Sequence, residues 1–145
     1  EEDEARQIPE IVLQEKCPEL FERMWFITET ILKPVIFSMY HTYSHDIATV
    51  QIAKYNPKNK QKGAWHHDES ADISIVVPLN TGDYVGGGTE FMHRVVKPLP
   101  TGHALMFPSA TSMHRGLAVE SGDRYLLVFW LYNEDKLEEN SENLL

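Results

Sequence analysis

The chain has 145 residues, of which 42% are apolar and 24% charged, so we expect one folded domain over residues 1–145 and not a disordered chain. The formal net charge of −9 argues against nucleic acid as a partner, and no apolar run approaches the ~20 residues of a membrane span. Cys17 is the single cysteine, which excludes an internal disulfide, while seven histidines direct any metal chemistry to nitrogen and oxygen ligands.

The first predicted element is a helix that begins at Pro18, after a charged lead-in over residues 1–7. Proline suits the first position of a helix, and Pro34 should end or kink this one. Apolar residues recur at steps of three and four, which places them on one helix face: Leu20, Met24, Ile27, Ile31 and Val35. We expect this face to pack on a sheet.

Beyond residue 46 the apolar pattern changes to the period of two that is typical of strands. Strands are predicted over residues 48–52, 72–79, 89–92, 103–107 and 124–132. Turns separate them at 80–88, 98–102 and 120–123, a polar loop covers 56–63, and an acidic tail covers 133–145 with Leu144 and Leu145 as a candidate docking end. One helix followed by short strands predicts a mostly β fold, a barrel or sandwich with helical backing.

Two overlapping pairs of metal-ligand side chains stand side by side in the sequence. In an extended segment residues i and i+2 point the same way, so His66 and Asp68 can present an imidazole and a carboxylate to one point. His67 and Glu69 would face the opposite side, and the commoner His-x-Asp pairing is preferred. With His114 as the third ligand, two histidines and one carboxylate leave positions open, as in non-haem Fe(II) oxygenases.

A second signal is Arg124, ten residues after His114. By chance, a chain of this composition contains roughly 0.3 His-x-Asp pairs and roughly 0.2 pairs with the His114–Arg124 spacing, so each signal is weak alone. Considered one at a time, His66 could equally be an exposed loop histidine, His114 a core histidine and Arg124 a surface cation on a strand. A guanidinium grips a carboxylate through two parallel hydrogen bonds, which is what a dicarboxylate chelating a metal at its other end requires.

Five short motifs occur in order along the chain: His66-x-Asp68, Gly86-Gly87-Gly88-Thr89-Glu90-Phe91, Gly102-His103-Ala104-Leu105-Met106-Phe107-Pro108, His114-Arg115-Gly116-Leu117 and Arg124-Tyr125. In this combination the chain resembles the 2-oxoglutarate/Fe(II) dioxygenases. Within them it is most similar to the catalytic domain of procollagen lysyl hydroxylases, on the run from His66 to Ser70, the run from Asp83 to Gly88 and the ten-residue step before Arg124. The resemblance covers about residues 8–132.

The resemblance implies a double-stranded β-helix, which is a jelly-roll or cupin-like barrel, with Fe(II) held by His66, Asp68 and His114. It implies that Arg124 binds the distal carboxylate of 2-oxoglutarate, assisted by the Tyr55 hydroxyl. The co-substrates are then 2-oxoglutarate and O2, the by-products are succinate and CO2, and ascorbate is a further candidate cofactor. The implied substrate is an unactivated C–H of a lysyl or prolyl side chain in a peptide or protein, and the implied assembly is a homodimer.

Three hypotheses about function remain at this stage: hydroxylation of a peptide side chain, the same chemistry on a nucleobase or small metabolite, and a non-catalytic barrel used for binding or assembly. The acidic net charge disfavours nucleic acid, and a binding module has no need of three ligands plus Arg124. Members of the family carry a cysteine where Thr89 stands. The scarcity of cysteine favours a cytoplasm-like compartment, whereas the resemblance points to the secretory pathway.

Overall fold

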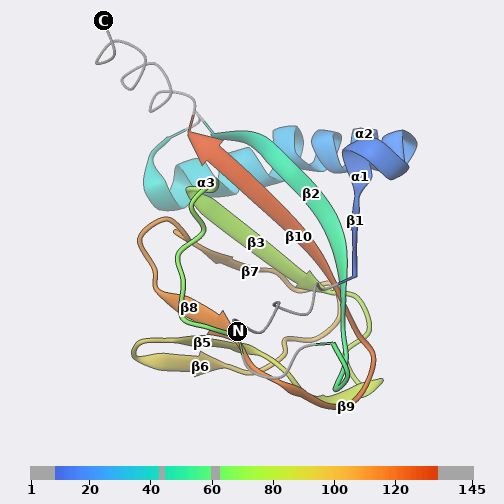
Figure 1. The fold of residues 1–145 in the computed structure, drawn as a ribbon. Helices are drawn as coiled ribbons and strands as arrows, with labels where there is room; N and C mark the ends of the chain where they lie inside the picture. The colour runs from blue at the N-terminus through green and yellow to red at the C-terminus, as the bar shows by residue number, and fades with distance from the viewer. Residues whose placement is uncertain (1–8, 43–44, 60–62, 134–145) are drawn as a thin grey trace, which may run out of the picture.

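A five-stranded antiparallel sheet forms the centre of the molecule (Figure 1). The computed structural model describes residues 9–42, 45–59 and 63–133. In the order in which they pair, the strands of this sheet are β1 (Glu10–Val12), β2 (His45–Tyr55), β10 (Arg124–Asn133), β3 (Ile73–Pro78) and β7 (Leu105–Phe107). Long, directly paired strands hold β2, β10 and β3 rigidly side by side, which suits them to carry a site.

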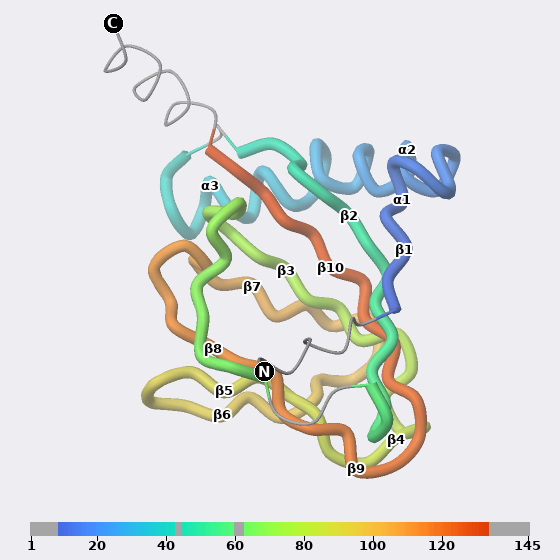
Figure 2. Tube along the Cα trace, in the orientation of Figure 1, coloured from blue at the N-terminus to red at the C-terminus, as the bar shows by residue number. Residues whose placement is uncertain are grey.

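Two smaller sheets lie across from the large one (Figure 2). The first pairs β6 (Arg94–Val96), β5 (Thr89–Phe91) and β8 (His114–Gly116), and the second pairs β4 (Tyr84–Gly86) with β9 (Val119–Gly122). An isolated antiparallel bridge between His66 and His114 adds one more short segment beside β8. Residues from the large sheet and from β5 and β8 enclose a common cavity between them.

The core lies on the other face of the large sheet, between it and the helices. Because side chains alternate along a strand, Leu127, Phe129 and Leu131 of β10 enter this core, while Leu126 and Val128 line the cavity. The fully packed core residues are Leu13, Ile36, Val50, Ile73, Ile75, Phe129 and Leu131. Each buried aliphatic side chain of this kind contributes about 1.5–3 kcal/mol to folding.

The long helix begins at Pro18 as predicted but does not end at Pro34. After a short α1 (Leu13–Lys16), α2 (Pro18–Ile27) runs into a π turn, η1 (Thr28–Leu32), and then into α3 (Lys33–Tyr40). Proline lacks an N–H and its ring collides with the carbonyl four residues earlier in a regular helix. The wide π turn directly before it accommodates the ring, so the helix continues for another six residues.

This π turn also changes which residues of the helix face the sheet. Leu20 and Met24 pack against the core as predicted, but Ile31 and Val35 are 54% and 42% exposed. The extra residue in the π turn rotates the rest of the helix by about 100°, which turns Leu32 and Ile36 inward instead. The sheet-facing residues therefore follow steps of four: Leu20, Met24, Thr28, Leu32 and Ile36.

All five predicted strands are present, and two predicted turns are partly wrong. The turn predicted over 80–88 contains β4, and most of the turn predicted over 120–123 belongs to β9. Strands of three or four residues contain few alternations, so β1, β6 and β8 were not predicted, although the equally short β5 and β7 were. Asn133, the first residue of the predicted tail, belongs to β10.

Several predicted features lie outside the described residues, namely the lead-in 1–7, residues 60–62 of the polar loop and the tail 134–145 with Leu144 and Leu145. Within the part of the chain that the structure describes, the longest apolar helical stretch is too short and too polar to cross a membrane.

Candidate active site

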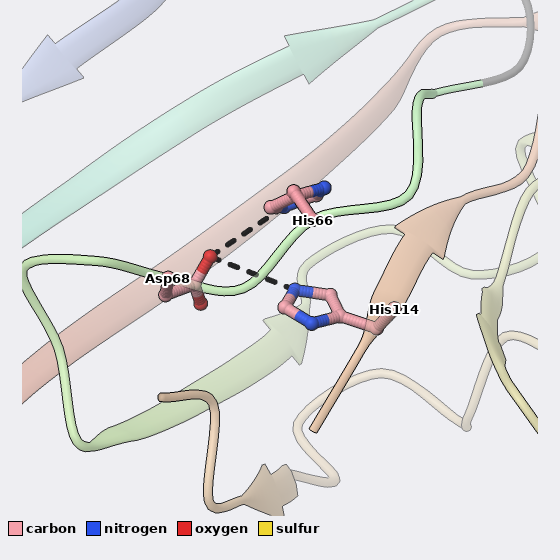
Figure 3. Close-up of side chains that lie close together, drawn as sticks. All are labelled: His66, Asp68 and His114. Atoms are coloured by element: carbon pink, nitrogen blue, oxygen red, sulfur yellow. Dashed lines mark ion pairs between the residues drawn. The ribbon is translucent and has the colours of Figure 1, made fainter. Parts of the chain in front are cut away.

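His66, Asp68 and His114 converge at one edge of the cavity (Figure 3). The carboxylate oxygen Oδ1 of Asp68 lies 3.5 Å from Nε2 of His66 and 3.6 Å from Nε2 of His114. The two histidines are direct partners across the bridge, where each backbone N–H donates to the other's carbonyl at 3.0 Å. Among the described residues, neither His67 nor Glu69 joins this cluster, so the preferred register is the one that the structure brings together.

Both imidazole rings are oriented by a hydrogen bond from the ring nitrogen that faces away from Asp68. Nδ1 of His66 lies 2.9 Å from the carbonyl of Ala64, and Nδ1 of His114 lies 2.8 Å from the carbonyl of Ser112. A carbonyl only accepts, so Nδ1 carries a proton in each ring, and in the neutral imidazole Nε2 then keeps its lone pair. In that form both lone pairs point toward Asp68, as in histidines that bind a metal.

The two oxygens of the Asp68 carboxylate have different neighbours. Its Oδ2 accepts a hydrogen bond of 2.5 Å from the hydroxyl of Ser74, which in turn lies 2.7 Å from the hydroxyl of Ser109. Its Oδ1 faces the two histidines. Two lone pairs and one carboxylate oxygen that face a common point repel one another unless a cation lies between them, so this donor set fits a divalent first-row metal with open coordination positions.

Side chains on the outer side of β8 and of the bridged segment hold His66 and His114 in place. Trp65 precedes His66 and Arg115 follows His114, and the Arg115 guanidinium lies 4.4 Å from the centre of the Trp65 ring. Arg115 Nε also donates to Glu90 on β5 at 2.7 Å. This row across β5, β8 and the bridged segment stabilises the position of the two histidines without using any atom that faces the His-Asp-His cluster.

Arg124 lies in the interior, at the far end of the cavity along β10. It is only 6% exposed, and its Nε is buried with no hydrogen-bond partner. Within the described residues no carboxylate lies at ion-pairing distance from its guanidinium, which instead lies 6.0 Å and 5.8 Å from the rings of Tyr55 and Tyr84. A buried cation without a paired anion is costly, so this position is suited to bind an anionic ligand.

Gly87 provides the space that Arg124 occupies. A Cβ built on Gly87 would lie 3.1 Å from Cδ and 3.2 Å from the terminal nitrogen Nη1 of Arg124, and its φ of +74° is in the region that favours glycine. The sequence predicts only a turn with closely spaced strands at residues 86–88. The structure adds that one of these glycines lies against the guanidinium.

Tyr55, which the sequence assigns to the same end of the cavity, is paired with Arg124 in the β2–β10 ladder. Burial raises the pKa of the Tyr55 hydroxyl above its usual value, and the positive charge of Arg124 opposes part of that rise. The phenol is therefore a neutral hydrogen-bond donor throughout the physiological pH range.

A cavity of about 130 Å³ connects the two ends, and its wall includes His66, Asp68, His114, Arg124 and Tyr55. That volume is close to the roughly 150 Å³ of an engineered cavity that holds benzene, so a small organic acid fits. The structure thus brings together all five residues that the sequence proposed for this site.

Sequence reasoning missed three residues of the site. Ser74 supports Asp68, Gly87 makes room for Arg124, and Gln51 lines the cavity between the two ends. Gln51 had a usable signal, because it lies in the predicted strand 48–52, and an extended chain places it on the same face as Tyr55, four residues later. Ser74 and Gly87 had none, since their roles depend on contacts that only the folded chain creates.

A His-Asp-His donor set between two facing antiparallel sheets defines the class of non-haem metal proteins built on a jelly roll. The profile of the 2OG-Fe(II) oxygenase superfamily matches residues 50–132, and the chain belongs to that superfamily. Membership implies Fe(II) as the cofactor and 2-oxoglutarate and O2 as the co-substrates.

The curated relatives include lysyl hydroxylases, in agreement with the resemblance. The chain is 32% identical over 120 residues to the multifunctional procollagen lysine hydroxylase and glycosyltransferase of Caenorhabditis elegans, an alignment that covers 77% of this chain and 16% of that protein. It is 27% identical over 113 residues to the procollagen lysyl hydroxylase and glycosyltransferase of Acanthamoeba polyphaga mimivirus, covering 74% and 13%. The chain therefore spans about one sixth or less of the length of these relatives.

Solved structures establish the fold. A prolyl-4-hydroxylase from Pseudomonas putida superposes with a TM-score of 0.67 at 17% identity, covering 92% of this chain and 76% of that one. The viral collagen prolyl hydroxylase of Paramecium Bursaria Chlorella virus-1 gives 0.64 at 18% identity, covering 88% and 79%. The predicted jelly roll with helical backing is thereby confirmed.

Proposed function

We propose that this chain is an Fe(II)- and 2-oxoglutarate-dependent hydroxylase that acts on a lysyl side chain of a peptide or protein, with succinate and CO2 as by-products. The observation that supports it most is the unpaired, buried guanidinium of Arg124, which shares one cavity with the His-Asp-His cluster. One end of the cavity suits a metal and the other suits a carboxylate. A dicarboxylate that chelates the metal meets both requirements.

In this proposal the residues divide the work by position. His66, Asp68 and His114 hold Fe(II), which when bound supplies the oxidative chemistry with O2. Arg124 grips the distal carboxylate of 2-oxoglutarate, and the neutral Tyr55 hydroxyl donates a further hydrogen bond to it. The apolar walls, among them Val76, Leu126 and Val128, exclude water from the space between.

A cationic peptide substrate suits the surface of the molecule. The net charge of −9 attracts basic chains over a distance, and the relatives above are named for lysine hydroxylation. The side chain of His66 is 46% exposed, against 9% for His114, so the metal end of the cavity opens to solvent on the His66 side. A side chain that projects from a large substrate can reach the metal from there.

The test has two stages. Anaerobic titration of the Fe(II)-loaded protein with 2-oxoglutarate should produce a visible charge-transfer band, because chelation at the metal creates it. Admission of air with a library of lysine- and proline-containing peptides should then add one oxygen atom to lysyl side chains, detected by mass spectrometry. Absence of the band contradicts the oxygenase site, whereas a band with succinate formation but no peptide oxidation contradicts the peptide substrate and favours a small metabolite.

A further inference from the structure

Two glutamines, Gln14 beside β2 and Gln51 on it, differ in their hydrogen bonding. Gln14, on α1, uses both ends of its amide: Nε2 donates to the carbonyl of Ala48 at 3.2 Å, and Oε1 accepts from the N–H of Val50 at 3.1 Å. Gln51 is 5% exposed and lines the cavity, and among the described residues its amide has no hydrogen-bond partner. Neither polar atom of this amide is sealed off from the cavity, so the amide is available to hydrogen-bond a ligand there.

The strand register fixes where along the cavity Gln51 lies. It pairs with Val128 on β10, which pairs in turn with Val76 on β3. Two residues away along the sheet is the Ser74–Trp130 pair, and Ser74 holds Asp68 of the metal cluster. Four residues away in the other direction is the Tyr55–Arg124 pair. Gln51 is therefore between the two ends, on the side of the metal.

We propose that Gln51 binds the metal-proximal end of 2-oxoglutarate, where its amide N–H donates to an oxygen of the 2-oxo acid group. This inference rests on the proposed function. A molecule that spans from the metal to Arg124 must pass Gln51, and the walls beside it are Val128 and Val76, which offer no hydrogen bond. Gln51 then orients the 2-oxo acid end, while Arg124 secures the opposite carboxylate. It is a binding residue for the chelating end of the ligand.

Two small ligands distinguish binding at the metal end of the cavity from binding at the Arg124 end. 2-Oxoglutarate reaches both, whereas oxalate has two adjacent carboxylates that chelate a metal but no distal carboxylate. Binding of each to the protein loaded with Mn(II), a redox-silent substitute for Fe(II), is measured by titration calorimetry. Gln51→Leu, which keeps the size and removes the amide, should weaken both ligands by about 10- to 100-fold, since a hydrogen bond to a charged group is lost. Arg124→Ala should weaken 2-oxoglutarate alone.

Gln14→Leu is the matched control. It removes the two hydrogen bonds to β2 and should lower the melting temperature of the protein, while the affinities for both ligands stay within about twofold of the wild type. Gln51→Leu should leave the melting temperature of the metal-free protein unchanged or raise it. Gln51→Glu should weaken both ligands further than Gln51→Leu, because it adds a negative charge beside a carboxylate.

Three outcomes would overturn the assignment in different ways. Unchanged affinity of Gln51→Leu for 2-oxoglutarate removes Gln51 from the site. Weakened 2-oxoglutarate with unchanged oxalate places the contact away from the metal and contradicts the proposed position. No binding of 2-oxoglutarate by the metal-loaded wild type contradicts the proposed function itself.

Discussion

The metal end and the arginine end of the cavity differ in their access to solvent. His66 at the metal end is nearly half exposed, whereas Arg124 at the other end is 6% exposed. A catalytic metal site needs an open side because reactants must enter and leave its coordination positions. A single guanidinium needs the reverse, since its attraction for a carboxylate weakens in water and strengthens in a dry, low-dielectric surrounding. The two ends therefore place different demands on the fold, and a substitution at one end should impair binding at that end alone.

The two ends also differ in how the chain builds them. The metal end joins a short bridged segment to β8, so it depends on the pairing of residues 48 positions apart in the sequence. The arginine end belongs to one long strand and is completed by Gly87 and two tyrosine rings. Substitutions at each end should thus affect metal binding and 2-oxoglutarate binding independently.

The largest effect is expected at the metal ligands. His66→Ala, Asp68→Ala and His114→Ala should each abolish turnover and lower metal affinity by at least about 100-fold, since each removes a ligand atom. Calorimetric titration with Mn(II) measures it. His67→Ala is the control, because its side chain lies outside the cluster, and it should bind metal like the wild type. Loss of metal by His67→Ala with retention by His66→Ala would show that the ligand register is displaced by one residue.

Arg124→Ala tests the other end. Loss of a charge-assisted, two-pronged pair in a dry site should weaken 2-oxoglutarate by about 30- to 1,000-fold while metal affinity is retained. Arg124→Lys should recover part of the binding, because lysine restores the charge but not the planar fork. Calorimetry and a melting curve on the same protein decide the matter. A lowered melting temperature with an unchanged 2-oxoglutarate affinity would make Arg124 a structural cation.

A smaller effect is expected at Gly87, with Gly102 as its control. Both have positive φ, +74° and +82°, so alanine should cost each roughly 1–2 kcal/mol of folding free energy. Only at Gly87 does the new Cβ meet Arg124, while at Gly102 it meets no atom within 4 Å. Gly87→Ala should therefore weaken 2-oxoglutarate about tenfold and Gly102→Ala should not. Equal binding by the two variants would contradict the contact between Gly87 and the guanidinium.

The smallest effect is expected for Tyr55→Phe, which should weaken 2-oxoglutarate by about 3- to 10-fold through the loss of one hydrogen bond. Burial raises the pKa of Tyr55, so the folded protein keeps a proton that the unfolded chain releases. The stability this confers is present below the ordinary tyrosine pKa and decreases as the pH rises through the folded value. Urea unfolding between pH 9 and about 11 should show a steeper alkaline loss of stability in the wild type than in Tyr55→Phe. Equal slopes would contradict the raised pKa.

The proximity of the candidate site residues was predictable from the sequence because side chains alternate along extended backbone. Alternation places His66 and Asp68 on one face, and the rigid run after Arg124 holds its side chain at a defined depth. The start of the helix was equally local, since it depends on Pro18 alone. These features need no knowledge of distant contacts.

The π turn and the role of Gly87 could not be predicted, because they depend on contacts between residues that are distant in the sequence. The apolar spacing around Ile31 and Val35 fits a regular helix, and the π turn that turns them outward is selected by packing against the sheet and by Pro34. The role of Gly87 follows from a side chain 37 positions later in the sequence. Local patterns contain neither piece of information.

The pairing of His66 with His114 has a further consequence for the integrity of the chain. A metal ion held by these side chains is a cross-link that closes a loop of 48 residues, in a chain whose one cysteine permits no internal disulfide. A cross-link between two distant residues reduces the entropy of the unfolded chain, as a disulfide does, but a chelator can remove this one. Chelation should accordingly expose the backbone amides of His66 and His114 to hydrogen exchange before the central sheet opens. The metal ion of the proposed site would then also be a reversible cross-link that stabilises the jelly roll.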